Sequence, residues 1–213
     1  AVESMDADYI YHLDTYQIYH ILLIGNGFLK LKVDNEVIIC CAPSVFVLKE
    51  NTCVEFMEAN MLSVQILRFD VSFLCPSVSY EMINSGKYAD FANNWGLFPL
   101  EVFYKTKLPI HRLLPLSTSE FLQAKQLSDG FTIELEDPQN PRWSCRARSY
   151  LGLLLELIHQ VYSDSISMNS SLLRYDIRDR HIWITKILKE IHSRYAEKLC
   201  IQSLAQLVKI NRN

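Results

Sequence analysis

Apolar and polar residues alternate with a period of two in the first third of the chain, and this pattern predicts β-strands. Phe28, Lys30 and Lys32 alternate with three aliphatic residues, and the Gly25-Asn-Gly27 segment before them suits a hairpin turn. Further short apolar segments lie at residues 36–41, 45–48, 53–57 and 61–69. Short strands joined by tight turns, without helices between them, predict an antiparallel sandwich or barrel over residues 9–69.

Helical spacing replaces this alternation after Asp70. Ser117 lies three residues before Glu120, the arrangement of a capping box, so we expect a helix over residues 118–128. Between residues 143 and 162, apolar residues recur every three or four positions on more than one helix face. They are either buried within their own domain or shared with a second copy, and exposed apolar rows favour a second copy. The residues expected to dimerise are Tyr150, Leu151, Leu154, Leu157, Ile158 and Val161.

The last thirty residues predict the beginning of a helix-turn-helix domain. An apolar stripe runs from Ile184 to Tyr195, and a second short helix carries the Leu204-Ala205 pair. A turn is expected at residues 210–213, just before the helix that would enter the DNA groove. The serine-rich residues 163–180 ahead of this region predict a linker.

The charge of the chain is unevenly distributed. The 213 residues, 49% hydrophobic and 21% charged, predict a soluble globular protein with one core, or one large domain plus a small piece. From Arg178 onward there are eight Lys or Arg and three Asp or Glu, a net charge of +5, whereas the preceding residues carry −8. An acidic body with a basic tail suits a sensor joined to a phosphate-binding domain. A solvated charged helix is the alternative interpretation.

The sequence also predicts the cellular compartment. The longest apolar run, around residues 18–24, is too short to span a bilayer, and no signal peptide is visible. The six cysteines contain no CxxC pair, which favours reduced, buried thiols over a disulfide framework. We therefore expect a cytoplasmic protein that makes no membrane contact.

These features together resemble the AraC family of bacterial transcription regulators. The resemblance rests on Ile191-His-Ser-Arg-Tyr195, Leu199-Cys-Ile, Ser203-Leu-Ala205 and the turn at Ile210-Asn-Arg-Asn213. The barrel, and the Trp143 to Arg148 segment that leads the long helix, resemble the sensor domain of that family, so the likeness covers nearly the whole chain.

The resemblance implies a mainly β fold with α: a cupin-like, jelly-roll barrel, a helical dimerisation segment and a partial all-α helix-turn-helix domain. The corresponding boundaries are residues 1–110 for the barrel, 111–162 for the dimerisation segment, 163–180 for the linker and 181–213 for the truncated DNA-binding domain. It implies a homodimer that responds to a small-molecule effector and, as a full-length protein only, binds promoter DNA.

Two features depart from the family pattern. Cys200 occupies the N-cap position where Ser, Thr or Asp is usual, which costs about 1 kcal/mol of helix stability. The recognition helix is absent from these 213 residues. Phosphate contacts from the predicted DNA-binding residues, Lys209 and Arg212, would therefore be weak and unspecific.

No pattern for catalysis or for a cofactor is visible. Many cupins hold a metal through His-x-His, a Glu and a later His, but His12 and His20 lie eight residues apart, so no metal is expected. The chain has no G-x-S-x-G, P-loop or G-x-G-x-x-G motif, so no enzymatic activity is expected. The alternative function is a metal-independent cupin that binds or converts a small molecule without a role at DNA.

A ligand pocket in the barrel is the remaining candidate site. Aromatic side chains with polar tips suit a small polar ligand such as a sugar, although each also suits a core or rim position. A bile acid, an aromatic acid or no ligand at all is equally compatible with these residues. A shift of one residue in strand register would turn any strand candidate to the other face. The candidates are the ring-bearing Tyr9, His12, Tyr16 and His20, the polar strand residues Glu55 and Gln65, and Trp95, which follows a polar loop and could close the mouth.

Overall fold

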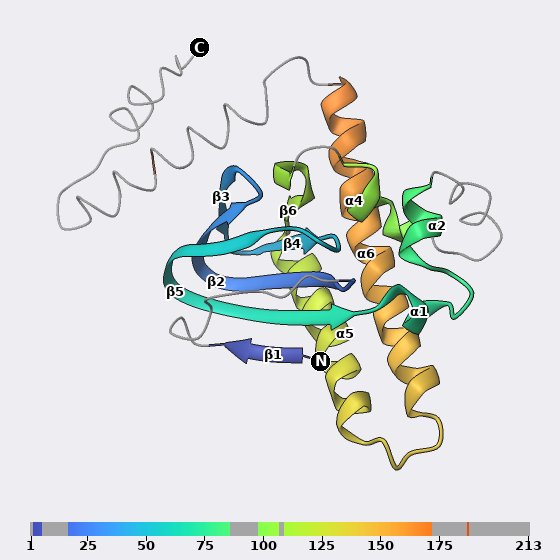
Figure 1. Cartoon of the computed structure of the whole chain (residues 1–213). Coiled ribbons are helices and arrows are strands. Elements are labelled where there is room, and N and C mark those ends of the chain that lie inside the picture. The colour runs from blue at the N-terminus through green and yellow to red at the C-terminus, as the bar shows by residue number, and fades with distance from the viewer. Residues whose placement is uncertain (1, 6–16, 86–97, 107–108, 172–186, 188–213) are drawn as a thin grey trace. The chain divides into compact units, whose positions relative to one another are not determined.

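The computed structural model describes residues 2–5, 17–85, 98–106, 109–171 and 187. The chain divides into two compact units, Ala1–Ile166 and Ser167–Asn213, and the division falls within the predicted linker. The predicted helix pair at the C-terminus, with Lys209 and Arg212, lies outside the described residues. The elements (Figure 1) are β1 (Val2–Met5), β2 (Tyr19–Val33), β3 (Glu36–Cys41), β4 (Ser44–Leu48), β5 (Val54–Phe69), α1 (Val71–Leu74), α2 (Tyr80–Asn84), η2 (Phe98–Leu100), α4 (Glu101–Tyr104), η3 (Pro109–Arg112), β6 (Leu113–Pro115), α5 (Thr118–Glu136) and α6 (Trp143–Ser171).

A curled antiparallel sheet forms the first half of the chain (Figure 1). Its strand order is β1-β5-β2-β4-β6. Strand β3 pairs with the second half of β2, from Phe28 to Val33, which we call the distal half; the first half, from Tyr19 to Ile24, is the proximal half. The two long strands pair along their whole length, from Tyr19 opposite Phe69 to Val33 opposite Val54. The antiparallel sheet predicted from the alternation is thus confirmed, and it forms a half-barrel in a mixed β and α fold.

The long strands bend at an irregularity around Gly27. The pairing of β2 with β5 shifts register between Ile24 and Phe28. Gly27 has a φ of +71°, and a Cβ atom there would lie 2.0 Å from the backbone oxygen of Asn60, so the position requires glycine. The predicted hairpin turn at residues 25–27 is therefore wrong, because these glycines form a bulge inside one continuous strand.

The sheet buries a different apolar cluster on each face. The inner face of the curl holds aliphatic side chains from both halves of β2, together with Phe46 of β4 and Ile66 of β5. The outer face of the proximal half packs Ile21, Leu67 and their neighbours against the helices, including Phe131 of α5. The apolar side chains of the inner cluster therefore form the core of the half-barrel.

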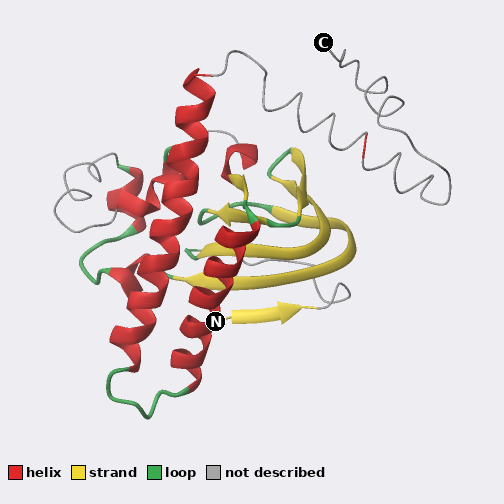
Figure 2. Cartoon of the chain, turned by 180° about the vertical axis from the view of Figure 1, so that it is seen from behind, coloured by secondary structure: helices red, strands yellow, loops and turns green. Residues whose placement is uncertain are grey.

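Helices α5 and α6 form an antiparallel hairpin beside the sheet (Figure 2). The predicted capping box is confirmed: Glu120 N–H donates to Ser117 Oγ, and Ser117 N–H donates to the Glu120 carboxylate. Helix α5 continues to Glu136, and α6 continues to Ser171, so regular structure extends into the predicted linker. No helix within the described ranges is long and apolar enough to cross a membrane.

Candidate functional site

The first predicted ligand-binding residue, His20, lies on the inner face of the sheet. It is fully buried on β2, between Leu48 of β4 and Arg68 of β5 in the register of the sheet. Its neighbours Leu22 and Leu48 belong to the aliphatic inner cluster, so His20 is a polar group at the margin of an otherwise apolar core.

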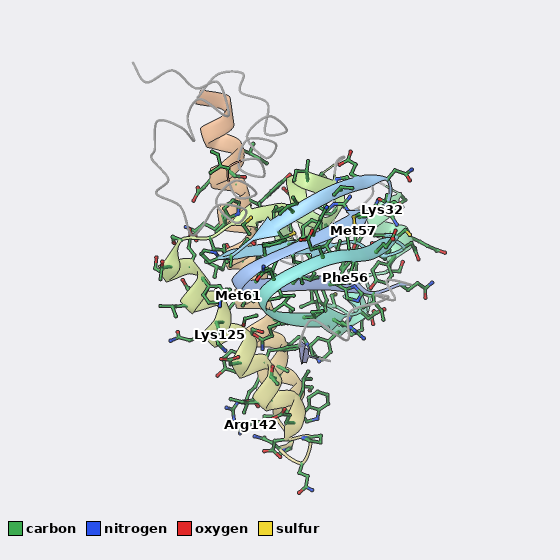
Figure 3. All side chains as sticks on the ribbon, turned by 90° about the vertical axis from the view of Figure 1, so that its left-hand side faces the viewer. Lys32, Phe56, Met57, Met61, Lys125 and Arg142 are labelled. Carbon is green, nitrogen blue, oxygen red and sulfur yellow. The ribbon has the colours of Figure 1, made fainter. Side chains whose placement is uncertain are left out.

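The other two placed candidates lie on other surfaces. Gln65 faces the helices, and its Nε2 donates to Asp129 Oδ1 of α5 over 3.3 Å. Glu55 is exposed on the outer face, where Lys32 Nζ donates to its carboxylate over 3.2 Å; Lys32 lies in the distal part of the sheet (Figure 3). These two residues and His20 therefore do not converge on one pocket. The remaining candidates, Tyr9, His12, Tyr16 and Trp95, lie outside the described residues, and their contact with a ligand stays a prediction.

The residues predicted to dimerise lie mainly on the core side of α6. Leu151, Leu154, Leu157 and Ile158 are all buried in the cluster between the sheet and the helices, and Tyr150 and Val161 are half-buried against the same cluster. Their own chain therefore covers these side chains. The solvent-facing side of α6 instead presents Arg146, Ser149, Leu153, Glu156 and Gln160.

A group of polar side chains, four of them buried, lies where the sheet meets the short helices; Tyr80 is half-buried and Asn84 is exposed. We call Tyr19, Glu50, Tyr80, Asn84, Thr106 and Arg112 the Arg112 cluster. Only 2% of Arg112 is exposed. Its Nε donates to Thr106 Oγ1 over 3.0 Å, and its Nη2 donates to the Thr106 carbonyl over 3.4 Å. Arg112 ends η3, and Thr106 follows α4, so the guanidinium joins these two segments.

The acidic member of the cluster is Glu50, in the turn between β4 and β5. It is 6% exposed, and its Oε1 accepts a hydrogen bond from Asn84 Nδ2 over 2.9 Å. Thr52 Oγ1 donates to the Lys49 carbonyl, which holds this turn in place. This turn also contacts the turn between β2 and β3, because the Cys53 N–H donates a hydrogen bond to Asp34 Oδ1.

The two tyrosines of the cluster pack against each other, and Tyr19 also packs against Phe103. Tyr19 stacks on Phe103 with ring centroids 4.5 Å apart, and its edge meets Tyr80 at 5.1 Å. The hydroxyl of Tyr80 accepts a hydrogen bond from the Val71 N–H. Aromatic side chains together with a few polar groups are a common composition of small-molecule sites in proteins.

Electrostatics couple the members of the cluster. Burial lowers the pKa of Arg112, and the nearby Asp34, Glu50 and Tyr19 partly offset this effect. Burial also raises the pKa of Tyr80, to which the negative charges of Asp70 and Glu50 add. Arginine is so strong a base that Arg112 stays protonated at physiological pH. The cluster therefore holds a permanent buried cation near an acidic side chain.

Reasoning from the sequence missed this cluster. Arg112 follows a proline and a histidine in a segment without periodicity, and Glu50 lies in a turn, where a carboxylate is ordinarily solvated. Only the packing of distant segments shows that both are buried. Within the described ranges, no group of three or more His, Cys, Asp or Glu residues is arranged to hold a metal ion.

Comparisons with known proteins include a distant structural likeness. No protein-family model matches the chain, and no curated protein matches it. The crystal structure of the AraC-like transcriptional activator CuxR is similar at a TM-score of 0.33 and 14% sequence identity. That alignment covers 92% of this chain and 58% of the CuxR chain, so this chain spans little more than half the length of that protein.

Proposed function

We propose that this protein is a ligand-responsive transcription regulator of the AraC type, acting in the cytoplasm as a homodimer on promoter DNA. The observation that carries the proposal is the order of its parts: a curled antiparallel half-barrel, a helical hairpin and then a basic segment. In this proposal the half-barrel is a cupin-type sensor, and the segment after residue 180 is a helix-turn-helix domain. Its net charge of +5 from Arg178 onward supports phosphate binding.

The role proposed for the Arg112 cluster is effector binding without catalysis. A guanidinium that stays charged suits recognition of an anion better than proton transfer. The cluster is also joined to α6. Thr106 Oγ1 donates to the Val102 carbonyl of α4, and Glu101 of the same helix lies 3.8 Å from His159 Nε2 of α6. An effector that binds two arrangements of α4 unequally would therefore shift α6 between them.

The solvent-facing side of α6 supports the proposed homodimer. Arg146, Ser149, Leu153 and Glu156 are spaced three and four residues apart, as a helix-pairing seam requires. Two copies in antiparallel orientation would place Arg146 opposite Glu156 of the second copy, and Ser149 opposite Leu153. Leu153 is 57% exposed in the single chain, and burial in such a seam would remove it from water.

Charge reversal on α6 tests the dimer. We expect Glu156→Arg to shift the protein from dimer to monomer in light scattering, because it would place two arginines opposite each other. The control is Glu136→Arg, at the exposed end of α5, which should leave the dimer unchanged. A monomeric wild-type protein at high concentration would contradict the homodimer.

Selection of duplexes from a random DNA pool, using the full-length gene product, tests the regulatory function. We expect a defined sequence to be enriched. Replacing Lys209 and Arg212 together by Ala should weaken binding, whereas Lys32→Ala, which removes a half-buried lysine from the sheet, should not. Failure to enrich any sequence would refute the regulator and leave a small-molecule binding protein.

A further inference from the structure

The half-barrel presents several strand edges that no other described strand covers. Such an edge carries unpaired backbone N–H and C=O groups and can add a strand from another chain, so proteins usually protect it. The outermost strands, β1 and β6, are short, and β6 ends in Pro115. The distal half of β5 lies beyond the reach of β1, and it is bulged, because its pairing with β2 shifts register between Lys30 and Leu31. Short length, proline and a bulge each hinder edge-to-edge pairing at these three strands.

Strand β3 has none of these protections. It lies at the margin of the sheet (Figure 1), and its six residues pair with β2 without a register shift. It contains no proline, and its one charged residue is Glu36, the first. Its outer face is apolar: Val37 is 53% exposed, and Ile39 and Cys41 are half-buried. A regular, apolar edge of this kind favours pairing with another strand.

The backbone groups of the same three residues are directed at the free edge. Directly after β3, the Ala42 N–H donates to the Gly27 carbonyl of β2 over 3.0 Å. In an antiparallel pair, alternate residues direct their N–H and C=O toward the same neighbouring strand, so the even-numbered residues of β3 face β2. Val37, Ile39 and Cys41 therefore direct their N–H and C=O groups away from β2.

The sequence of β3 is complementary to itself about a two-fold axis. The outward-directed residues pair most fully when Ile39 lies opposite Ile39 of a second copy and Val37 lies opposite Cys41. A shift of two residues in either direction leaves fewer of them paired. In the full register the apolar side chains on the outer face meet apolar side chains, and Glu36, at the strand end, meets no second carboxylate.

We propose that β3 pairs edge to edge with β3 of a second copy, in antiparallel orientation with Ile39 at the two-fold axis. This contact is separate from the seam proposed on α6, so a chain that uses both assembles beyond a dimer. Only the six residues of β3 take part, against about 20–30 on each side of a standard interface, so we expect a dissociation constant of about 0.1–1 mM.

Sedimentation equilibrium on the full chain carrying Glu156→Arg isolates this contact from the α6 seam. We expect dimers to form between about 0.1 and 1 mM. Adding Ile39→Glu should weaken association about 10-fold or more, because two carboxylates would meet at the axis, whereas within one chain the new carboxylate lies opposite Lys30. An equimolar mixture of the Ile39→Glu and Ile39→Lys proteins should restore association. The control is Met57→Glu, at an exposed apolar residue of the bulged β5 edge, which should change nothing.

Cross-linking tests the register. Hydrogen-bonded residue pairs have Cα atoms about 5.5 Å apart, which a disulfide can bridge. We expect Val37→Cys, oxidised with diamide, to form a disulfide with Cys41 of the second copy, identified by peptide mapping. Positions 37 and 41 of one strand lie about 13 Å apart, so this bond must join two chains. Met57→Cys is the control and should form no bond to Cys41.

A second variant covers a failure of Ile39→Glu to fold. Val37→Pro removes an N–H that faces the free edge and takes no bond from β2, so it should weaken association in the same way. Edge pairing is refuted if the Glu156→Arg protein stays monomeric to about 1 mM, or if neither Ile39→Glu nor Val37→Pro weakens its association. Slow hydrogen exchange of the Ile39 N–H in dilute monomer would also overturn it, by showing that the chain itself covers this edge. None of these outcomes depends on whether the protein selects a DNA sequence.

Discussion

The helical hairpin contains two glycines whose replacement by alanine should have opposite effects. Gly152 lies within α6, and a Cβ atom added there would meet nothing within 4 Å. Alanine is favoured over glycine inside a helix by about 0.8–1.0 kcal/mol, because glycine loses more backbone entropy on folding. We expect Gly152→Ala to raise the free energy of unfolding by about 1 kcal/mol, and the melting temperature by about 2–4 °C.

Gly130 of α5 provides the matched comparison. Alanine at position 130 brings the same gain in helix propensity as at position 152. However, its Cβ atom would lie 2.6 Å from Cε1 and 2.8 Å from Cδ1 of the Tyr150 ring. Real carbon atoms do not approach so closely, so the ring or the helix must move. Overpacking of this kind costs about 1–3 kcal/mol. The expected net effect of Gly130→Ala is therefore a loss of about 0–2 kcal/mol.

Urea unfolding followed by circular dichroism measures both effects, at a protein concentration where dilution leaves the transition unchanged. The double variant Gly130→Ala/Tyr150→Ala should show a favourable interaction of about 1 kcal/mol or more, because removing the ring removes the clash. Equal effects of the two single replacements would refute the close packing of α5 against α6 at Gly130. Destabilisation by Gly152→Ala would show that this face of α6 is closely packed.

Three further predictions follow from the buried and capping groups. Glu134→Gln should lower the free energy of unfolding by about 1–3 kcal/mol, because Glu134 is 5% exposed and its carboxylate lies 2.7 Å from Arg146 Nη2; the exposed Glu136→Gln is the control, and an equal loss there would contradict the role of the ion pair. Hydrogen bonds from Ser117 lower the pKa of Glu120 below its ordinary value of 4.5, so the charged carboxylate stabilises the fold above that value, and the contribution disappears as the pH falls through the lowered pKa. Glu120→Ala should therefore cost about 1 kcal/mol at neutral pH and progressively less in acid, and a pH-independent loss in urea titrations would argue against the capping box. Thiol labelling followed by mass spectrometry should modify the exposed Cys53 and Cys145 in the native protein but Cys40 only on unfolding, since burial raises the pKa of Cys40; rapid native labelling of Cys40 would contradict its place in the inner core.

Local patterns in the sequence were sufficient to predict much of the fold. Period-two alternation identified the antiparallel strands from residue 28 to residue 69, and Ser117 with Glu120 located the start of α5. These signals are reliable because each depends on neighbours within one turn or one strand. The lengths of α5 and α6 were underestimated, since the serine-rich residues that extend α6 to Ser171 show no apolar periodicity.

The candidate site was only partly accessible to the same reasoning. His20 was identified as an aromatic side chain with a polar tip, and the structure places it on the inner face. Gln65 and Glu55 were identified as polar residues inside strands, but they face the helices and solvent, respectively. A strand pattern shows which residues share a face; it does not show what covers that face. The bulge at Gly27 also exchanges the two faces along β2.

By itself, the sequence determined the strands, the capped helix and the basic C-terminal segment, because alternation, capping and charge are properties of consecutive residues. Only the tertiary structure decided that α6 buries the leucines expected at a dimer and exposes Arg146, Ser149, Leu153 and Glu156. It alone brought Arg112 of η3 near Glu50, 62 residues earlier in the chain, and removed both from water. Burial is set by the segments that fold over a residue, and those segments are distant in the chain.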